Sequence, residues 1–313
     1  YHNIWFRAKM LFLLIAAVNI YWFHHKLQKS QDDWDVMPDS SGGASARDGA
    51  FWLAAGTAGA LLLAAGAAHA QNVVTMNTVQ IFGTIDPAKI SDYTDYMAAV
   101  NLYDSLVTVD SEGSLQPQLA ERWDISDDAS EVVFHLRADA TFTDGSPVTA
   151  EDVVYSFERL LDINQGPANL FAGVVEPGNV EAVDDRTVKF TLSRTFAPFM
   201  ATVPALMILN KEVVEANAGD DMGQTWLATN TAGAGAYTLQ SWERGSRMTI
   251  VRNEDYYGEM PENPIDAERW IVTNDEATVR ALAASGELTM SSQFQSPDTY
   301  SALDAMDRFR IVS

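Results

Sequence analysis

Few side chains in this sequence could carry out catalysis or bind a metal ion. The 313 residues include 5 histidines and no cysteine, which excludes cysteine nucleophiles, thiolate metal sites and disulfides. His135 is the only histidine after residue 70. A serine hydrolase would have to use it, yet the chain contains no G-x-S-x-G motif. Zinc and copper sites usually need several His or Cys ligands, so we expect no catalytic residues, no metal and no cofactor.

Three acidic pairs and one glycine motif remain as candidates. The pairs Asp127–Asp128, Asp184–Asp185 and Asp220–Asp221 lie far apart in turn-like sequence, where Asp side chains typically accept local hydrogen bonds. A spatial carboxylate pair for glycoside hydrolysis stays open, although nothing in the sequence selects one. Gly233-Ala234-Gly235 lacks the third glycine of a dinucleotide-binding loop, because Thr238 stands in its place.

The charge of the chain limits its partners. It has 20 basic and 43 acidic residues, a net charge of −23. Acidic and basic residues balance within the first 70 positions, so the whole excess follows them. Nucleic-acid binding needs a basic face, and we therefore expect no nucleic-acid partner. The 47% hydrophobic and 20% charged content is typical of a globular protein.

The N-terminal 70 residues are expected to lie outside the fold. Residues 1–47 combine a short apolar helix, Met10–Phe23, with a polar linker. The chain starts with Tyr, and Met37 would be a natural start, so residues 1–36 are interpreted as upstream sequence similar to the tail of an unrelated membrane protein.

Residues 48–70 have the pattern of a signal peptide. An apolar run over Ala50–Ala68 follows Arg47 and ends in Ala68-His69-Ala70, which predicts export and cleavage after Ala70. The alternative is a retained anchor helix, since the run is nearly long enough to span a bilayer.

The remaining chain is predicted to alternate strands and helices. In Glu131–Arg137, Val132, Phe134 and Leu136 face one side of a strand. Thr149 caps a helix with Asp152 as its partner, and Val153, Phe157, Leu160 and Leu161 form its buried stripe. A second helix is expected to begin at Thr273, with Glu276 three residues later, and to end at Gly286. Other expected elements are a helix over Tyr93–Leu106 and strands over Val73–Phe82, Thr187–Leu192, Tyr237–Trp242, Arg247–Arg252, Arg269–Thr273 and Phe309–Ser313.

Several motifs resemble one protein family. The run FHLR at 134–137 is followed by DGSPVTAEDV at 144–153, with IDP at 85–87, GAY at 235–237 and RNEDYY at 252–257. Together they resemble bacterial family 5 extracellular solute-binding proteins, the peptide, opine and nickel group of ABC importers. The segment ALAASGEL at 281–288 is also similar, although Thr289 replaces the family's usual Asp.

The physical roles of these motif residues are structural. Trp123 and Phe134 are bulky candidates for the core. Asp144-Gly145 predicts a tight turn in which glycine takes positive φ. Pro147 sets the chain direction before Thr149, whose cap is completed by Asp152. None of these residues is expected to be catalytic.

The resemblance implies a mixed α/β fold, a periplasmic-binding-protein-like lobe of type II-like form that is incomplete here. It implies a first part of lobe I over 71–103, an inserted subdomain over 104–198 that carries the signature, and a continuation over 199–313, with the second lobe absent. In the family, ligand lies in a cleft between two lobes. The loop after Asp86-Pro87 faces that cleft, which makes Ser91, Asp92 and Tyr93 the candidate ligand-binding residues. The alternative is that they form an exposed loop that leads into a helix.

The implied function is the periplasmic solute-binding component of an ABC importer. It would capture peptides or similar small solutes, act as a monomer with permease and ATPase subunits, and not be an enzyme. The first lobe alone is expected to bind peptides weakly or not at all. A membrane-anchored ligand sensor on the same fold and a secreted hydrolase remain alternatives, and the ligand could be a peptide, an opine, a sugar or a metal chelate.

Overall fold

The computed structural model of the chain describes residues 72–310. The predicted upstream segment (1–47) and signal peptide (48–70) therefore lie outside the described residues. Within residues 72–310, no helix has the length and hydropathy needed to cross a membrane.

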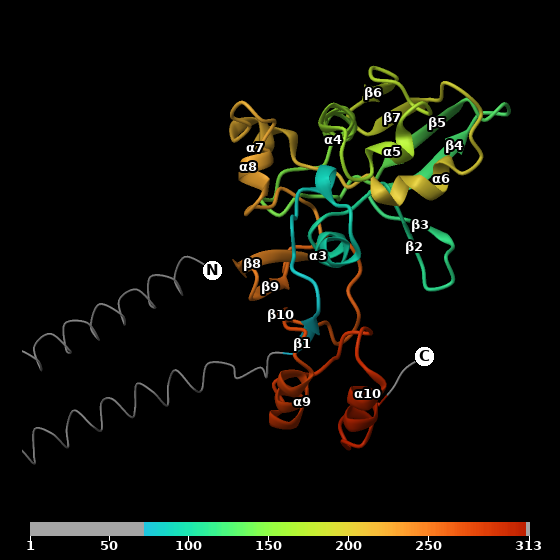
Figure 1. The fold of residues 1–313 in the computed structure, drawn as a ribbon. Coiled ribbons are helices and arrows are strands. Elements are labelled where there is room, and N and C mark those ends of the chain that lie inside the picture. The colour runs from blue at the N-terminus through green and yellow to red at the C-terminus, as the bar shows by residue number, and fades with distance from the viewer. Residues whose placement is uncertain (1–71, 311–313) are drawn as a thin grey trace, which may run out of the picture. The chain divides into compact units, whose positions relative to one another are not determined.

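One four-stranded sheet joins the start of the described chain to strands from its last third. Its strand order is β1-β10-β9-β8 (Figure 1). The strands are β1 (Val73–Thr78), β8 (Tyr237–Glu243), β9 (Arg247–Arg252) and β10 (Ala267–Val272). β1 pairs with β10 in parallel, and the other two ladders are antiparallel. Because β1 and β10 lie far apart in sequence, this sheet can form only when the intervening chain returns.

A second four-stranded sheet is wholly antiparallel, with the order β4-β5-β7-β6. Its strands are β4 (Ala120–Ile125), β5 (Glu131–Leu136), β6 (Val180–Asp184) and β7 (Thr187–Thr191). A hairpin of β2 (Val107–Val109) and β3 (Leu115–Pro117) precedes it. In β5, Val132, Phe134 and Leu136 are buried while the residues between them are half-buried, which confirms the expected alternation.

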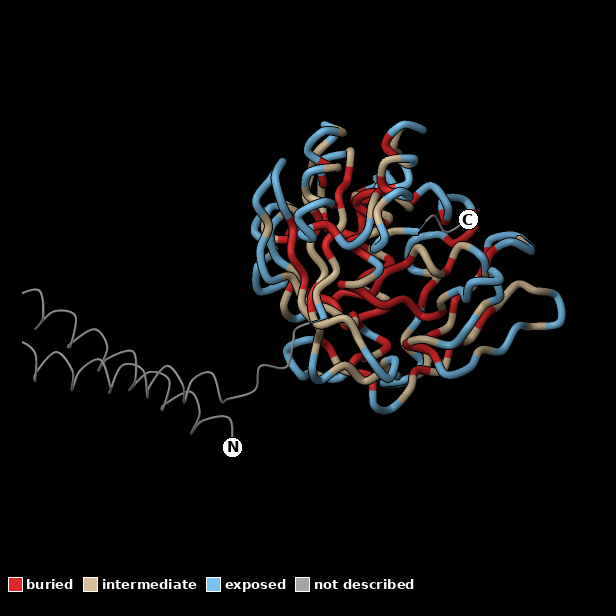
Figure 2. Tube along the Cα trace, turned by 90° about the horizontal axis from the view of Figure 1, so that it is seen from below, coloured by how far each residue is buried: buried red, intermediate tan, exposed pale blue. Residues whose placement is uncertain are grey.

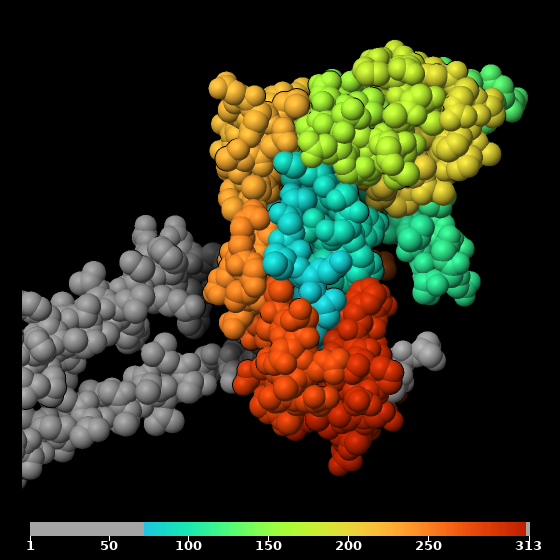
Figure 3. Space-filling model, in the orientation of Figure 1, coloured from blue at the N-terminus to red at the C-terminus, as the bar shows by residue number. Residues whose placement is uncertain are grey.

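Helices pack around these sheets. They are η1 (Pro87–Lys89), α3 (Tyr93–Leu102), α4 (Ala150–Ile163), α5 (Ala168–Phe171), α6 (Phe199–Thr202), η2 (Val203–Ala205), α7 (Lys211–Ala216), α8 (Gln224–Leu227), α9 (Glu276–Ser285) and α10 (Pro297–Asp304). In Figure 3, the cyan segment that contains η1 and α3 lies between the yellow-green part with the second sheet and the red part with α9 and α10.

Two main hydrophobic cores form. Buried segments run through the interior of the described chain in Figure 2. The first lies between the second sheet and α4, where the ring centroids of Phe157 and Phe190 are 5.6 Å apart, edge to face. Most of its residues fall within 104–198, the stretch that we propose as an inserted subdomain, although Phe199 also joins it. The second core includes Phe82 and Trp270 beneath the first sheet. Trp123, expected in the core, is only half-buried at its edge, because β4 is an edge strand.

The N-terminus of α4 begins where predicted. The Asp152 carboxylate accepts hydrogen bonds from the Thr149 N–H at 2.9 Å and from its hydroxyl at 2.7 Å. The other carboxylate oxygen of Asp152 accepts from the Lys211 N–H at 2.9 Å. Asp152 therefore joins the starts of α4 and α7, a long-range role that the capping pattern did not indicate.

Several predicted element boundaries were wrong. The helix expected over Tyr93–Leu106 ends at Leu102, and the strand expected over Val73–Phe82 ends at Thr78. Thr273 does not cap α9; Asp275 does, accepting from the Thr278 N–H at 3.0 Å, while the Thr273 hydroxyl accepts from the Asp275 N–H. The helix still ends at Gly286, as expected. The strand expected over Phe309–Ser313 does not form at 309–310, where no neighbouring strand pairs with the chain, and 311–313 lie outside the described residues.

The turn at Asp144-Gly145 gives a testable prediction. Gly145 has φ +87°, and a Cβ there would meet nothing within 4 Å. Gly145→Val should therefore destabilise the fold by about 1–3 kcal/mol through backbone strain alone. Thr149→Ala, which removes a capping hydroxyl, should cost about 1 kcal/mol. Urea unfolding measures both changes.

Gly145→Asn is the matched control for the turn, because asparagine tolerates left-handed backbone better than valine. Asparagine should cost clearly less than valine. Equal unfolding midpoints for all variants and the parent chain would contradict the turn and cap assignments.

Candidate ligand-binding pocket

A pocket of about 540 Å³ opens on the surface beside η1 and the start of α3. Three chain segments line it: residues 87–96, residues 166–170 and residues 205–207. Its volume suits a small organic molecule or a few peptide residues. The first segment contains Ser91, Asp92 and Tyr93, so the structure places all three predicted ligand-binding residues in one pocket wall. Their contact with ligand stays a prediction.

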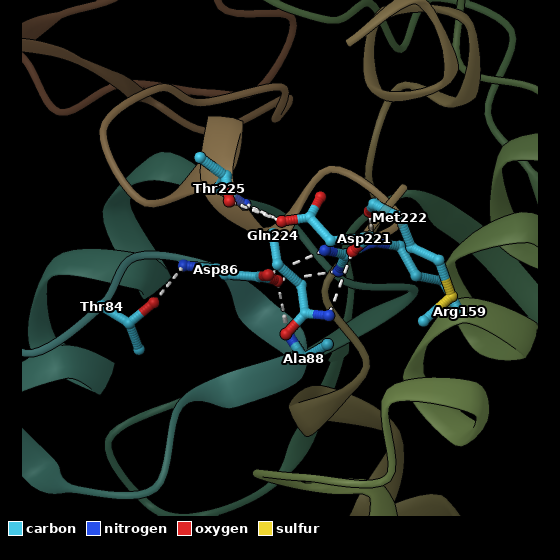
Figure 4. Close-up of polar contacts among 8 residues, drawn as sticks. All are labelled: Thr84, Asp86, Ala88, Arg159, Asp221, Met222, Gln224 and Thr225. Atoms are coloured by element: carbon cyan, nitrogen blue, oxygen red, sulfur yellow. Dashed lines mark hydrogen bonds and ion pairs between the residues drawn. The ribbon is translucent and has the colours of Figure 1, made fainter. Parts of the chain in front are cut away.

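The first wall of the pocket, residues 87–96, follows directly after Asp86, whose buried carboxylate fixes its position. The carboxylate accepts two hydrogen bonds from the Arg159 guanidinium, at 2.8 and 2.7 Å, and one from the Ala88 N–H at 3.1 Å (Figure 4). Both charged side chains are almost fully buried, at 2% exposed for Arg159 and 0% for Asp86. A buried ion pair contributes more to a defined geometry than to net stability. It fixes the Asp86-Pro87 turn against α4.

Arg159 also reaches a third segment. Its Nε donates to the Met222 carbonyl oxygen at 2.8 Å, and Met222 has an unusual φ of +57°. One guanidinium therefore joins α4, the turn before η1 and the chain that leads into α8, as Figure 4 shows.

Gly166 brings the second wall against the first. A Cβ at this position would be 2.7 Å from the Ile90 carbonyl oxygen and 2.9 Å from that of Ala88. The loop between α4 and α5 can therefore pack on the 88–90 backbone only because residue 166 has no side chain. Pro167, Asn169 and Leu170 continue this wall, and Ala205 and Met207 complete the pocket.

The exposed rim of the pocket is set by the first turn of α3. Asp92 caps the helix, its Oδ1 accepting from the Asp95 N–H at 2.9 Å. This leaves the Tyr93 and Tyr96 side chains exposed by 54% and 40%. The Tyr93 ring meets Phe294 edge to face at 6.4 Å. Ser91 lies in the same exposed loop.

Sequence reasoning missed the other two walls. Tyr96 and Leu170 lie in helices whose spacing indicates only packing, and Met207 looks like an ordinary core residue. Gly166-Pro167 marks a turn after α4, but nothing local shows that it packs on the 88–90 loop. The signature residues lie outside the pocket lining; they are Trp123, Phe134, Asp144, Gly145, Pro147, Thr149 and Asp152.

His135 and the glycine motif at 233–235, which the sequence also offered as candidates, lie outside the pocket lining. His135 lies on the exposed sheet face, with Nε2 2.9 Å from Asp124 Oδ2. Within residues 72–310, no group of three or more His, Asp or Glu side chains is arranged to hold a metal ion. The glycine motif packs on α3, where a Cβ at Gly233 would lie 2.1 Å from the Leu102 carbonyl oxygen.

Asp104 is a buried carboxylate away from the pocket. It accepts hydrogen bonds from Gln118 Nε2 at 2.7 Å, from the Tyr256 hydroxyl at 3.1 Å and from the Tyr257 hydroxyl. Burial raises the pKa of Asp104 to about 6, against the opposing effect of these donors. Burial likewise raises the pKa of Glu268 to about 7.

The solved structures that this mixed α/β lobe resembles are those of periplasmic binding proteins. Residues 114–309 match the family described as bacterial extracellular solute-binding proteins, family 5 middle. The chain belongs to this family.

Among curated relatives, the chain is 42% identical over 185 residues to the probable D,D-dipeptide-binding periplasmic protein DdpA of Escherichia coli, covering 57% of this chain and 35% of DdpA. The structure of Haemophilus influenzae OppA in complex with RPPGFSPFR is similar, with a TM-score of 0.65 and 27% identity over 75% of this chain and 48% of OppA. The binding protein AgaA in complex with agropinic acid, from A. tumefaciens, gives a TM-score of 0.65 and 26% identity over 75% and 46%. The matched part of this chain spans less than half of each of these proteins.

The buried Asp86–Arg159 pair should contribute far more to stability than the similar but exposed Arg137–Asp139 pair. Asp86→Asn should lower the free energy of unfolding by about 3–5 kcal/mol, because Arg159 would stay buried without its counter-charge. The matched control is Asp139→Asn, which breaks the exposed two-bond contact of Arg137 with Asp139. It should change stability much less. Denaturant unfolding measures the free energy of unfolding of both variants. Equal losses would contradict a dominant role for burial.

The raised pKa of Asp104 predicts that the folded chain becomes more stable as the pH falls. Its raised pKa means that the folded chain binds the proton more tightly than the unfolded chain. Its contribution is therefore fully present at low pH and is lost as pH rises through about 6. Stability should increase by about 1–1.5 kcal/mol from this group when pH falls from about 8 to about 5. Asp104→Asn should remove this part while retaining that of Glu268. Parallel pH profiles of unfolding for both chains would contradict the assignment.

Proposed function

We propose that this chain is a solute-binding component of an ABC importer and that it captures peptides or similar small solutes in the pocket beside η1. It would act in the periplasm as a monomer, pass its ligand to permease and ATPase subunits, and release that ligand chemically unchanged. Ser91, Asp92 and Tyr93 would contact the ligand from the first wall.

One observation carries this proposal. The pocket has a fixed back and an exposed rim: the Asp86–Arg159 pair and Gly166 hold the walls together, while Tyr93, Tyr96 and Leu170 remain exposed. Exposed apolar side chains around a preformed pocket favour binding, because a ligand covers them without reorganising the fold. The family membership supports the same function, and the names of relatives support peptides as first candidates.

Ligand-observed NMR tests the proposal with the whole chain and a mixture of di- and tripeptides. We expect at most weak binding, because the matched part of the chain spans less than half of each relative, and full recovery of intact peptide after prolonged incubation. Leu170→Arg should abolish binding, because it places a long side chain at the pocket wall.

Val183→Arg is the matched control, since Val183 is also an exposed aliphatic residue, at 59% against 41% for Leu170, and lies outside the pocket. It should bind as the parent chain does. Equal binding by both variants would contradict the site, absence of any binding by the parent at millimolar peptide would contradict capture by this pocket alone, and peptide cleavage would contradict a non-enzymatic role.

A further inference from the structure

The chain passes from one main core to the other at Asp104. Tyr103, just before it, belongs to the second core, and Leu106, just after it, belongs to the first. The Asp104 carbonyl oxygen accepts from the Ile208 N–H at 2.9 Å, which ties this crossing to the 206–209 segment. Asp104 is only 2% exposed. A carboxylate is therefore buried at the junction of the two cores.

The loop between β9 and β10 reaches this junction with two tyrosines. Tyr256 and Tyr257 both donate their hydroxyls to Asp104 Oδ2, and the Gln118 side chain donates to Oδ1. Although β9 and β10 belong to the first sheet, the Tyr257 ring packs against the first core, which lies under the second sheet. The loop therefore bridges the two parts of the fold, and one carboxylate accepts both of its hydroxyl contacts.

Few other bonds attach this loop. Within residues 72–310, the two tyrosine hydroxyls donate the only hydrogen bonds that join residues 254–263 to chain outside the loop. Most of these residues are exposed, and none lies in a helix or strand. A Cβ at Gly258 would lie 2.5 Å from the Tyr256 ring, so the glycine allows the loop to fold back over that ring. A segment with so few bonds to its surroundings can open locally while both cores stay intact.

Among the described residues, none of the charged groups around Asp104 forms an ion pair with it. The Arg137 guanidinium lies over the ring of the second tyrosine, 4.8 Å from its centroid, and makes its own two-bond contact with Asp139. Glu254 and Asp255, beside the tyrosines, are exposed, and the 206–209 segment is wholly apolar. Burial raises the pKa of both tyrosine hydroxyls, so they remain donors at neutral pH.

The balance at Asp104 differs between a closed and an open loop. In the closed loop, burial disfavours the ionised carboxylate more than the three donors favour it, and the pKa of Asp104 is raised. In an open loop, water replaces the tyrosine hydroxyls and removes the cost of burial. The closed form therefore binds a proton more tightly than the open form, and a rise in pH favours opening.

We propose that Asp104, Tyr256 and Tyr257 form a latch that closes the loop over 254–263 onto the junction of the two cores, and that this latch opens locally more often as pH rises. The latch determines how firmly the stretch over 104–198 is held against the first sheet. Solute binding in the pocket does not require such a device, so the latch goes beyond the proposed function.

Hydrogen–deuterium exchange of the whole chain tests the latch, because amide exchange reports local opening. After correction for intrinsic exchange rates, opening of residues 254–258 should increase about tenfold from about pH 5 to about pH 8. This factor follows from a carboxyl pKa of about 6 in the closed latch and an ordinary value in the open one. A fragment over β4 and β5 should open far less. Equal opening of both fragments would overturn the latch, since unfolding of the whole chain would then explain the exchange.

Asp104→Asn should make the opening of the loop independent of pH, because asparagine has a similar shape and does not titrate. Glu268→Gln is the matched control. Burial raises the pKa of Glu268 to about 7, but this residue lies in β10, outside the latch. It should retain the tenfold response. A response that persists in Asp104→Asn, or is lost in Glu268→Gln, would overturn the assignment to Asp104.

Two Tyr→Phe variants test the hydroxyl contacts while keeping the rings. Tyr257→Phe should raise the opening of the loop about tenfold at pH 8 and by less at pH 5, because the ionised carboxylate loses a donor. In Tyr237→Phe, the lost hydroxyl donates to the neutral Ile265 carbonyl oxygen at 3.0 Å, so the pH response should not change. Equal pH responses of both variants would overturn the role of the hydroxyl. The parent chain tests the latch even where a variant fails to fold, since opening that does not change between pH 5 and pH 8 would overturn it.

Discussion

The constraint on which the pocket depends is that neither charge of the Asp86–Arg159 pair can be left alone in the interior. Both side chains are essentially inaccessible to water, and an isolated buried charge is far more costly than a buried pair. The turn before η1 must therefore stay where the guanidinium of α4 reaches it. Because Arg159 also donates to the Met222 carbonyl, the unusual backbone of Met222 is stabilised by the same group. Three segments that are distant in sequence are positioned by one side chain.

Close packing acts on the same loop from another direction. Gly166 allows the α4–α5 loop to approach the 88–90 backbone to within van der Waals contact. The hydrogen bonds of the Asp86–Arg159 pair fix the orientation of the turn before η1. The steric contact at Gly166 limits how closely the α4–α5 loop can approach it. The two constraints are complementary, and together they define the distance between two pocket walls. The pocket is therefore a consequence of how the loop is held, rather than a gap left between loosely packed elements.

Local features of this fold could be predicted from the sequence, and long-range ones could not. The alternation in β5 and the Thr149–Asp152 cap depend on neighbouring residues, so the pattern was sufficient. The start of α9 was misplaced because Thr273 and Asp275 both suit a cap, and the observed turn uses both, one to cap the helix and one to bind the Asp275 N–H. The strand expected near residue 309 failed because β-propensity cannot form a ladder without a partner strand. No periodic pattern in the sequence indicates the Asp86–Arg159 pair or the close approach of Gly166, because each depends on the tertiary path of the chain. Resemblance to a family led to Ser91, Asp92 and Tyr93, but local pattern could not reveal the opposite walls.

On the proposed function, a pocket with a buried, fixed back and an exposed rim would allow one fold to accommodate different ligands. Substitutions at exposed positions such as Ser91 or Tyr93 have small effects on stability, because these side chains make few contacts within the fold. Changes at Asp86, Arg159 or Gly166 would instead leave a charge unpaired or force two backbones apart. The rim is therefore free to change chemically while the back is not, and ligand preference can vary without loss of the pocket. On this chain the exposed rings of Tyr93 and Tyr96 form part of that rim, and they contribute less to holding the fold together than the buried Asp86–Arg159 pair does.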